Sequence, residues 1–523
     1  MSAVITLPAQ AQARSRIRRP AFRLASPAVP FAVAVVNAAT FLIVRPNVGD
    51  LQAALARQLA ASSGVGLKYW FQWFGGGTTP GHYSVLSPYL SSFIGALWSG
   101  AIATVVMTPL VHRALVGTRY QLTGTWVATI VAGFNIWSGR VPFALGCAMG
   151  VIAVIGVRER RVLIAFVGAI GAVLSSPVTG AFLGFGLFTA FLVERDYRRM
   201  AFLTGLVTGS ALISVALYFG SPGPQGYTLA ASLIASGAAL IMLFARPAPG
   251  LRVALWLTAI AAPFVSEIPN GLGSNYARLP WICLPAAVVA TAHVRRKVAI
   301  AAIIPAVICC AQATVVDLKM SRQPAASASY YRSLIARLST IPNLSNYRLE
   351  VVQDIHIHAA AYQLIRTTAI AGGYETQEQN ALNSVLKSDK QLNAVSYKVW
   401  LDNSAVGYVA FDKRTEGDSA EYRLVGSGTL SYLTPIWSDR TWTLYKVRFA
   451  TPIVHPPEKL ISATQSSLTL SVPCACRFNV RVRYSKFLTA TDVDTGLAAA
   501  VEDDLTGWTV VQTTAPGTYN LRG

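Results

Sequence analysis

The chain has 523 residues, of which 53% are hydrophobic and only 13% are charged, and its formal net charge is +21. This composition excludes an ordinary soluble globule and favours a multi-span membrane protein. The basic charge does not indicate a nucleic-acid partner, because it is concentrated in the apolar part of the chain. Residues 1–316 hold 23 Lys and Arg against 5 Asp and Glu, whereas residues 317–523 hold 21 against 18.

A membrane-spanning helix needs about 20 mostly apolar residues, and the chain offers about eleven such stretches. They are 28–45, 85–110, 122–138, 141–157, 162–176, 177–193, 200–219, 226–245, 253–267, 279–293 and 298–316. Turn signals around residues 138–140 and 175–177 separate neighbours that would otherwise merge. The sequence therefore predicts an α-helical multi-span transmembrane domain over 28–316, with a large first extracytoplasmic loop at 46–84.

Loop charges predict the orientation of these spans. With the N-terminus in the cytoplasm, the cytoplasmic loops hold 18 basic residues and the extracytoplasmic loops hold 5, as the positive-inside rule requires. The five are Arg45, Arg57, Lys68, Arg140 and Arg278. We therefore expect a multi-pass plasma-membrane protein whose basic N-terminus, 1–27, is cytoplasmic and whose C-terminal domain is extracytoplasmic.

The tail is predicted to hold two units. Residues 320–455 favour an α/β domain, with strands at 347–353, 406–412 and 442–449 and a helix over 377–401. Residues 456–523 favour a small β-sandwich or jelly roll, because short strand-like stretches alternate with turns there.

Two of the six cysteines, Cys474 and Cys476, stand in this second unit. A single intervening residue makes a disulfide between them strained, and no second Cys pair or His cluster lies nearby to complete a zinc site. We expect two free thiols without a metal.

The loop at 46–84 is the only long polar interruption of the apolar part, and its single carboxylate is Asp50. Two interpretations of Asp50 remain open. It caps the helix that follows by accepting backbone N–H bonds, or it is a general base that takes a proton from an acceptor hydroxyl at the membrane surface. The aromatic run at 69–74 is most simply an interfacial belt, and its rings also suit stacking on sugars.

Further polar side chains are predicted on the same face of the membrane. His82 and Tyr83 share a turn before the second span, and His82 suits a phosphate leaving group. An arginine at the rim of a helix bundle either extends its head to water or binds a phosphate. The candidate substrate-binding residues are His82, Tyr83, Arg140, Glu267, Asn275 and Arg278.

With these residues in place, the chain resembles the GT-C superfamily of membrane glycosyltransferases, which use polyprenyl-phosphate sugars. The resemblance lies in the architecture of 28–316 and implies an acidic catalytic residue near the first span, a position that Asp50 matches. The stretches GHYSVLSP, SGRVPFALG and GSNYARLP, with YKVWLDNSAVGYVAF and YLTPIWSDRTWTLYKV in the tail, resemble a group of actinobacterial multi-span membrane proteins. Many GT-C enzymes have two adjacent acids where Asp50 stands alone, followed by Leu51, and this departure weakens both the metal-assisted version of the mechanism and the catalytic assignment. A divalent cation stays an open alternative with no assigned ligand.

The leading hypothesis is an inverting glycosyl transfer, from a polyprenyl-phosphate sugar in the membrane lipid to a cell-envelope glycan or protein, on the extracytoplasmic face. Asp50 is the base in this hypothesis, and His82, Arg140 and Arg278 hold the phosphate. The alternative is a transporter or a flippase for lipid-linked sugars; the lack of carboxylates in the middle of the spans argues only against coupling to ions. A third class is a non-catalytic envelope scaffold whose working part is the tail.

Overall fold

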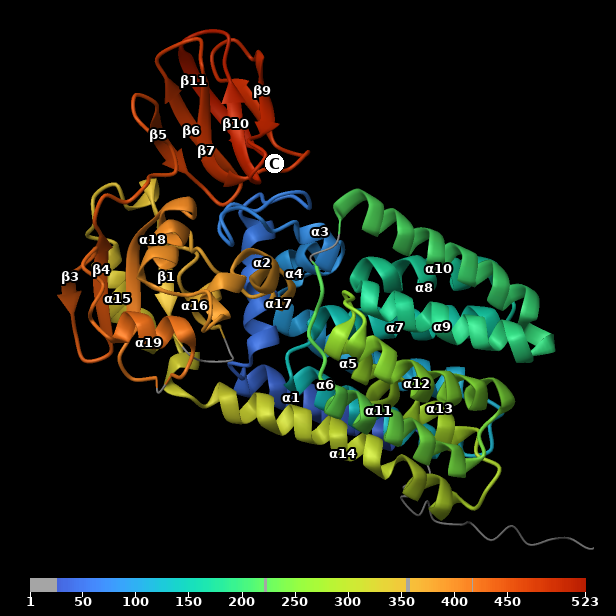
Figure 1. The fold of residues 1–523 in the computed structure, drawn as a ribbon. Helices are drawn as coiled ribbons and strands as arrows, with labels where there is room; N and C mark the ends of the chain where they lie inside the picture. The colour runs from blue at the N-terminus through green and yellow to red at the C-terminus, as the bar shows by residue number, and fades with distance from the viewer. Residues whose placement is uncertain (1–25, 221–222, 354–357, 416) are drawn as a thin grey trace, which may run out of the picture.

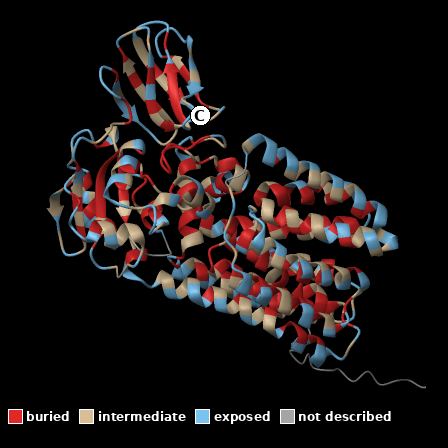
Figure 2. Ribbon diagram, viewed as in Figure 1, coloured by how far each residue is buried: buried red, intermediate tan, exposed pale blue. Residues whose placement is uncertain are grey.

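The computed structural model describes residues 26–220, 223–353, 358–415 and 417–523. A helical part at 26–321 leads through its last helix into the tail, which lies beside and above it (Figure 1). Buried residues gather inside the helix bundle and inside both tail units, as the red segments of Figure 2 show. Of the predicted cytoplasmic N-terminus, only residues 26 and 27 lie within the described part of the chain.

The helical part consists of apolar helices joined by short turns. Its helices are α1 (Ala28–Val44), α2 (Gly49–Ser62), α3 (Pro80–Tyr83), α4 (Ser87–Ile94), α5 (Ala96–Ala114), α6 (Gln121–Trp137), α7 (Val141–Arg158), α8 (Val162–Ser175), α9 (Pro177–Val193), α10 (Arg198–Phe219), α11 (Leu229–Met242), α12 (Pro249–Glu267), α13 (Pro285–Ala290) and α14 (Arg296–Ser321). Among the described residues, four helices (α7, α10, α12 and α14) are long and apolar enough to cross a membrane, or up to six spans if each of two bent pairs counts as one. The apolar helices α8, α9 and α11 are shorter. Eleven crossings therefore stay a prediction.

Two of the predicted spans are broken. The stretch 85–110 forms α4 and α5, which meet at an angle of 105°. Gly95 joins them with φ of +87°, a backbone conformation that side-chain-bearing residues rarely adopt. The stretch 279–293 forms a π-helical turn at Leu279–Cys283 followed by the short helix α13, which begins at Pro285. Proline has no backbone N–H with which to continue the preceding turn.

The first tail unit is the predicted α/β domain. Its strands are β1 (Arg348–Val352), β2 (Val406–Asp412), β3 (Leu433–Ser438) and β4 (Trp442–Val447), and its helices are α15 (Ala328–Leu338), α16 (Ala360–Gln363), α17 (Thr376–Leu382), α18 (Ala394–Asn403) and α19 (Ala420–Gly426). The sheet order is β1-β2-β4-β3, with β1 parallel to β2 and the other pairs antiparallel. The single helix predicted over 377–401 is wrong. Asn393 caps α18 with its side chain, so the chain makes two helices there.

The second tail unit is a seven-stranded antiparallel sheet in the order β5-β6-β11-β8-β9-β10-β7. Its strands are β5 (Lys459–Ala463), β6 (Ser467–Val472), β7 (Arg477–Arg483), β8 (Thr489–Asp492), β9 (Ala498–Asp503), β10 (Trp508–Gln512) and β11 (Gly517–Arg522). Its core comes from alternate apolar positions, such as Leu468, Leu470 and Val472 on β6. The predicted β-rich unit is present, and its description as a sandwich stays a prediction.

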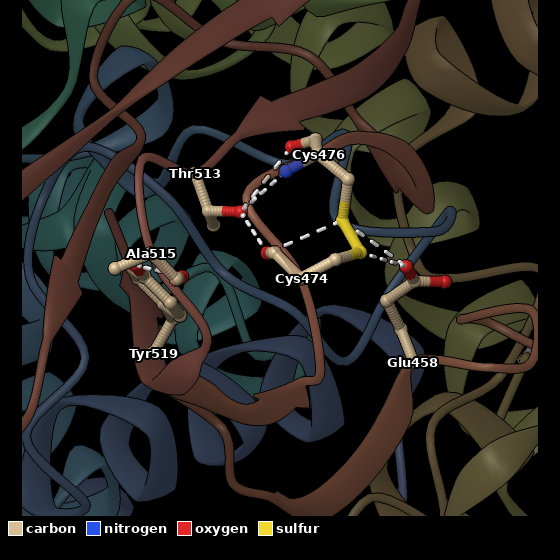
Figure 3. The surroundings of a disulfide bond; sticks show 6 residues. All are labelled: Glu458, Cys474, Cys476, Thr513, Ala515 and Tyr519. Atoms are coloured by element: carbon tan, nitrogen blue, oxygen red, sulfur yellow. Dashed lines mark hydrogen bonds between the residues drawn. A yellow bond between two sulfur atoms is a disulfide. The ribbon is translucent and has the colours of Figure 1, made fainter.

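The expectation of free thiols at Cys474 and Cys476 is wrong, because the two residues form a disulfide (Figure 3). The chain bends between β6 and β7 and brings their Cα atoms to 5.4 Å, within the usual range for a disulfide. The Thr513 hydroxyl holds the bend by donating a hydrogen bond to the Cys474 carbonyl oxygen at 3.0 Å.

The first loop of the helical part lies under the tail. Trp70 and Trp73 are fully buried, and they pack with side chains of α15 and β1 in one hydrophobic core. The indole nitrogen of Trp73 donates to the Ala361 carbonyl oxygen at 2.9 Å. The interpretation of this run as an exposed interfacial belt is therefore wrong: the tail covers these rings, so they serve as core.

Candidate functional site

Asp50 lies in the first turn of α2 and faces three donors from distant parts of the chain. Its Oδ2 accepts from Nε of Arg140 at 3.3 Å and lies 3.8 Å from Nη2 of Arg278. Its Oδ1 accepts from the hydroxyl of Tyr374, a tail residue, at 3.1 Å. The N-cap of α2 is Val48, and no side chain caps the helix there. The interpretation of Asp50 as a helix cap is therefore wrong, and its role as a general base stays a prediction.

Local backbone geometry brings Arg140 and Arg278 to this point. Arg140 precedes α7 and follows Gly139, which has φ of +78°. A Cβ at Gly139 would lie 2.4 Å from the backbone nitrogen of Leu51, so glycine is what allows α2 to approach this turn. Arg278 follows the 3₁₀ turn Gly273–Ala277, where the chain turns back after α12.

A second carboxylate, Asp317, completes the charged cluster. Its Oδ2 lies 3.4 Å from Nη2 of Arg140, which therefore bridges Asp317 and Asp50. The side chains of Asp50, Arg140, Arg278 and Asp317 are 17–31% exposed, so the cluster is partly open. Sequence reasoning missed Asp317 because the last apolar stretch was ended at residue 316; an extension of that helix by one residue would have found it.

His82 belongs to a different, buried cluster. Its Nε2 lies 2.9 Å from an oxygen of Glu375 and 3.9 Å from one of Glu378, both on the tail. Glu375 also forms an ion pair with Arg57 of α2, and Glu378 accepts from the hydroxyl of Thr78 at 2.7 Å. We predicted that His82 would bind a phosphate beside Asp50. In the structure, His82 instead contacts Glu375 and Glu378 of the tail.

The two glutamates of this cluster are in opposite electrostatic situations. Burial alone would raise the pKa of Glu375, but His82 and Arg57 outweigh burial and lower its pKa to about 2. Burial raises the pKa of Glu378 well above its ordinary value, and the neighbouring negative charge of Glu375 raises it further. The charged form of Glu375 is therefore stabilised against Arg57 and His82, whereas the charged form of Glu378 is disfavoured.

The ligand atoms of His82, Glu375 and Glu378 lie within 4.8 Å of one another, a spacing that a metal ion can use. These residues fit an ion-pair network better than a cation site, because Glu375 already accepts from His82 and Arg57 and the buried guanidinium repels a second cation. Among the described residues, neither cluster with metal-ligand spacing includes Asp50. The described residues therefore supply no set of metal ligands around Asp50 for the divalent cation that some GT-C enzymes use.

Tyr83 lies between the two clusters, whereas Glu267 and Asn275 lie apart from both. The Tyr83 ring is 3.9 Å from the guanidinium carbon of Arg57, a cation–π contact. Burial raises the pKa of Tyr83, Arg57 and Arg278 oppose that rise, and Asp50 and Glu375 add to it. Glu267 is exposed at the end of α12, and the Asn275 amide donates to the Gln225 side-chain oxygen at 2.8 Å.

An apolar cavity of about 550 Å³ runs through the helix bundle between α5, α6, α7, α9 and α13. Its lining follows α7 from Phe143 to Arg158, about 22 Å at a rise of 1.5 Å per residue. At one end, the guanidinium carbon of Arg278 lies 5.1 Å from the centre of the Phe143 ring. The Asp50 cluster is thus joined to one end of the cavity through a residue that lines it.

The arrangement has a defined chemical capacity. An apolar cavity that ends beside two arginines suits an amphiphile with a long apolar chain and an anionic head, and guanidinium groups bind phosphate bidentately. A carboxylate beside those arginines can accept a proton from an incoming hydroxyl. Sequence reasoning found Asp50, Arg140 and Arg278, but it missed Tyr374 and Glu375, for which no local signal exists.

No family model matches the chain, and no curated protein matches it. Among solved structures, it is similar to the mycobacterial arabinofuranosyltransferase AftD, with 13% identity and a TM-score of 0.46 over 95% of this chain and 57% of that one. It is similar to the oligosaccharyltransferase of Archaeoglobus fulgidus, with 11% identity and a TM-score of 0.44 over 74% of this chain and 69% of that one. The chain thus spans little more than half of the arabinofuranosyltransferase.

Proposed function

We propose that the protein is an inverting membrane glycosyltransferase, which moves a sugar from a polyprenyl-phosphate donor to a cell-envelope glycan or protein on the extracytoplasmic face. The observation that carries this proposal is the contact of Arg278 with Phe143, which joins a charged cluster to an apolar cavity. A polyprenyl phosphate has a matching structure, an anionic phosphate joined to a long apolar chain. Its chain fits the cavity along α7, and its phosphate fits Arg140 and Arg278.

The proposed reaction uses these groups in one displacement. Asp50 takes the proton of an acceptor hydroxyl, and the resulting oxygen attacks the anomeric carbon of the sugar from the face opposite the phosphate. A new glycosidic C–O bond forms while the bond from the anomeric carbon to the phosphate oxygen breaks. Polyprenyl phosphate leaves with the bonding electrons, and Arg140 and Arg278 stabilise its growing negative charge.

Binding of polyprenyl phosphate tests the proposal without knowledge of the sugar, because every such donor releases this product. We expect purified protein in detergent to bind decaprenyl phosphate more tightly than decaprenol, its neutral alcohol. Arg278→Gln should weaken decaprenyl phosphate binding about 10-fold to 100-fold, the usual loss for a hydrogen bond to a charged group. Native mass spectrometry or a fluorescence titration measures both affinities.

The control for this measurement is Arg113→Gln, which removes an arginine whose partner is Glu159 and not the Asp50 cluster. It should leave the affinity for decaprenyl phosphate unchanged. Equal affinities of the wild-type protein for the phosphate and the alcohol would contradict the proposed donor class.

Filling the cavity should also weaken donor binding. Gly186 of α9 lines the cavity, and a Cβ placed there meets no atom within 4 Å. Gly186→Phe should lower the affinity for decaprenyl phosphate about 10-fold or more, because each displaced CH₂ group forfeits about 0.8 kcal/mol of burial. Gly209→Phe on α10 is the matched control, since its Cβ also meets nothing and it does not line the cavity. Equal affinities of the two variants for decaprenyl phosphate would show that its polyprenyl chain does not bind in this cavity.

The flippase alternative is supported by one observation, the extension of the cavity along α7 from Phe143 to Arg158. A flippase would move a fluorescent polyprenyl-phosphate lipid between the leaflets of proteoliposomes, and Asp50→Asn would do so at the wild-type rate. A transferase would consume the donor instead, and it would need Asp50 to do so.

A further inference from the structure

Residues 370–378 of the tail, here called the strap, run along the first loop of the helical part. The backbone N–H of Ile370 donates to the carbonyl oxygen of Gln72 at 3.0 Å, and the N–H of Phe74 donates to that of Gly372 at 3.2 Å. A Cβ at Gly373 would lie 2.4 Å from the Phe74 ring, so the strap packs there at backbone contact. The strap is therefore docked by main-chain hydrogen bonds and by close packing.

Tyr374 lies at the centre of the strap and reaches the candidate base. Its hydroxyl donates to Oδ1 of Asp50 at 3.1 Å. A Cβ at Gly49 would lie 2.5 Å from this hydroxyl, so the residue before Asp50 leaves the space that Tyr374 occupies. Burial raises the pKa of Tyr374, and Asp50 raises it further, so the hydroxyl remains a donor across the physiological pH range.

The strap is clamped on the C-terminal side of Tyr374. Glu375, the next residue, is held by Arg57 of α2 and by His82 at the end of α3. Three residues on, Glu378 accepts from Thr78. These partners belong to the same loop as Asp50, so they fix the position of Tyr374 relative to the carboxylate that it contacts.

The two oxygens of Asp50 have separate partners. Oδ2 faces Arg140 and Arg278, while among the described residues Oδ1 accepts a hydrogen bond only from Tyr374. When a donor phosphate takes up the two arginines, Tyr374 is the donor that continues to orient the carboxylate. Oδ2 is then available for the proton of the acceptor hydroxyl.

We infer that Tyr374 is a positioning residue for Asp50, so that the catalytic site is assembled from the helical part and the tail together. This inference rests on the proposed function. It assigns the tail a part in the proposed chemistry.

Tyr374→Phe tests the inference, because it removes the hydroxyl and keeps the ring that packs in the strap. With whichever decaprenyl-phosphate pentose or hexose the wild type consumes, we expect kcat to fall about 10-fold to 100-fold, the loss expected for one hydrogen bond to a charged group. The affinity for decaprenyl phosphate should remain that of the wild type, because Tyr374 is not a phosphate ligand. On an Asp50→Asn background, Tyr374→Phe should have no further effect on kcat.

A second measurement requires no sugar donor. Modification of Asp50 by a water-soluble carbodiimide, followed by mass spectrometry in the presence of decaprenyl phosphate, should be several-fold faster in Tyr374→Phe than in the wild type. The matched control is Tyr331→Phe, since Tyr331 is also buried and its hydroxyl bonds to the Ala325 carbonyl and the Gln353 side chain, not to Asp50.

The outcomes separate the inference from the function on which it rests. Wild-type kcat and wild-type carbodiimide labelling in Tyr374→Phe would overturn the inference, as would equal losses in Tyr374→Phe and Tyr331→Phe. Full transfer activity in Asp50→Asn would overturn the assignment of the base instead. A fall in kcat in both Asp50→Asn and Tyr374→Phe, with donor affinity unchanged in the latter, supports both.

Discussion

Asp50→Asn is expected to reduce glycosyl transfer by about 10²-fold to 10⁴-fold, the usual contribution of general-base catalysis. The amide has the shape of the carboxylate, and its oxygen can still accept a hydrogen bond from Tyr374 or Arg140. It cannot take the proton of an acceptor hydroxyl. The loss should therefore appear in kcat, measured as acceptor-dependent consumption of a polyprenyl-phosphate sugar in proteoliposomes.

Glu267→Gln is the matched control for this substitution. Glu267 is the other carboxylate of the helical part that we predict on the extracytoplasmic face, but in the structure it is exposed and lies outside the Asp50 cluster. Its conversion to an amide should leave transfer unchanged. If Glu267→Gln and Asp50→Asn were equally active, the proton would have to leave by another group, and Asp317 would be the next candidate.

Glu375→Gln is expected to destabilise the protein by about 3–5 kcal/mol, the cost of breaking a buried ion pair from one side. Arg57 and Glu375 are each about 3–4% exposed, and Nε of Arg57 already has no hydrogen-bond partner among the described residues. Removal of the carboxylate leaves the guanidinium charge buried without a counter-charge. Thermal unfolding in detergent, followed by tryptophan fluorescence, should show a clearly lowered Tm.

Glu378→Gln is the internal control, because Glu378 lies three residues away and is equally buried. Burial disfavours its charged form by raising its pKa, and an amide oxygen can accept the Thr78 hydroxyl in its place. Its Tm at neutral pH should therefore stay close to that of the wild type. A larger loss of stability in Glu378→Gln than in Glu375→Gln would contradict the opposite pKa shifts of the two glutamates.

The two glutamates should also act in opposite directions on the pH dependence of stability. The pKa of Glu375 falls from 4.5 to about 2 on folding, so its stabilisation is complete above about pH 4.5 and is lost as the pH falls toward 2. The pKa of Glu378 is raised on folding, so its contribution declines as the pH rises above 4.5. In a plot of Tm against pH, Glu375→Gln should lack the part of the decline at acid pH that Glu375 causes. Glu378→Gln should lack the part of the decline at higher pH that Glu378 causes.

Asp50, Arg140 and Arg278 could be found from the sequence because membrane topology is a strong constraint. Alternating apolar and basic segments predict a common face for residues that are far apart in the chain, and these three are polar groups at the ends of apolar helices. The α/β character of the first tail unit was equally accessible, since its strands are short and rich in β-branched and aromatic residues.

Tyr374, Glu375 and the buried state of Trp73 could not be found in this way. The partners Tyr374 and Asp50 are 324 residues apart, and no local pattern marks a tyrosine in a tail loop as the partner of a carboxylate. The aromatic run at 69–74 has the composition both of a membrane-interface belt and of a protein core. Only the docking of the tail decides between these two environments.

The strap also has a consequence for how the protein is made. The hydrogen-bond donor on Oδ1 of Asp50 is synthesised more than three hundred residues after Asp50 itself. The membrane helices can all insert while ribosomal synthesis of the tail is still in progress, and such a nascent chain already holds the apolar cavity and both arginines. In the proposed reaction, Asp50 is oriented only once the tail has folded onto the first loop, so we expect transfer to begin after the tail is complete.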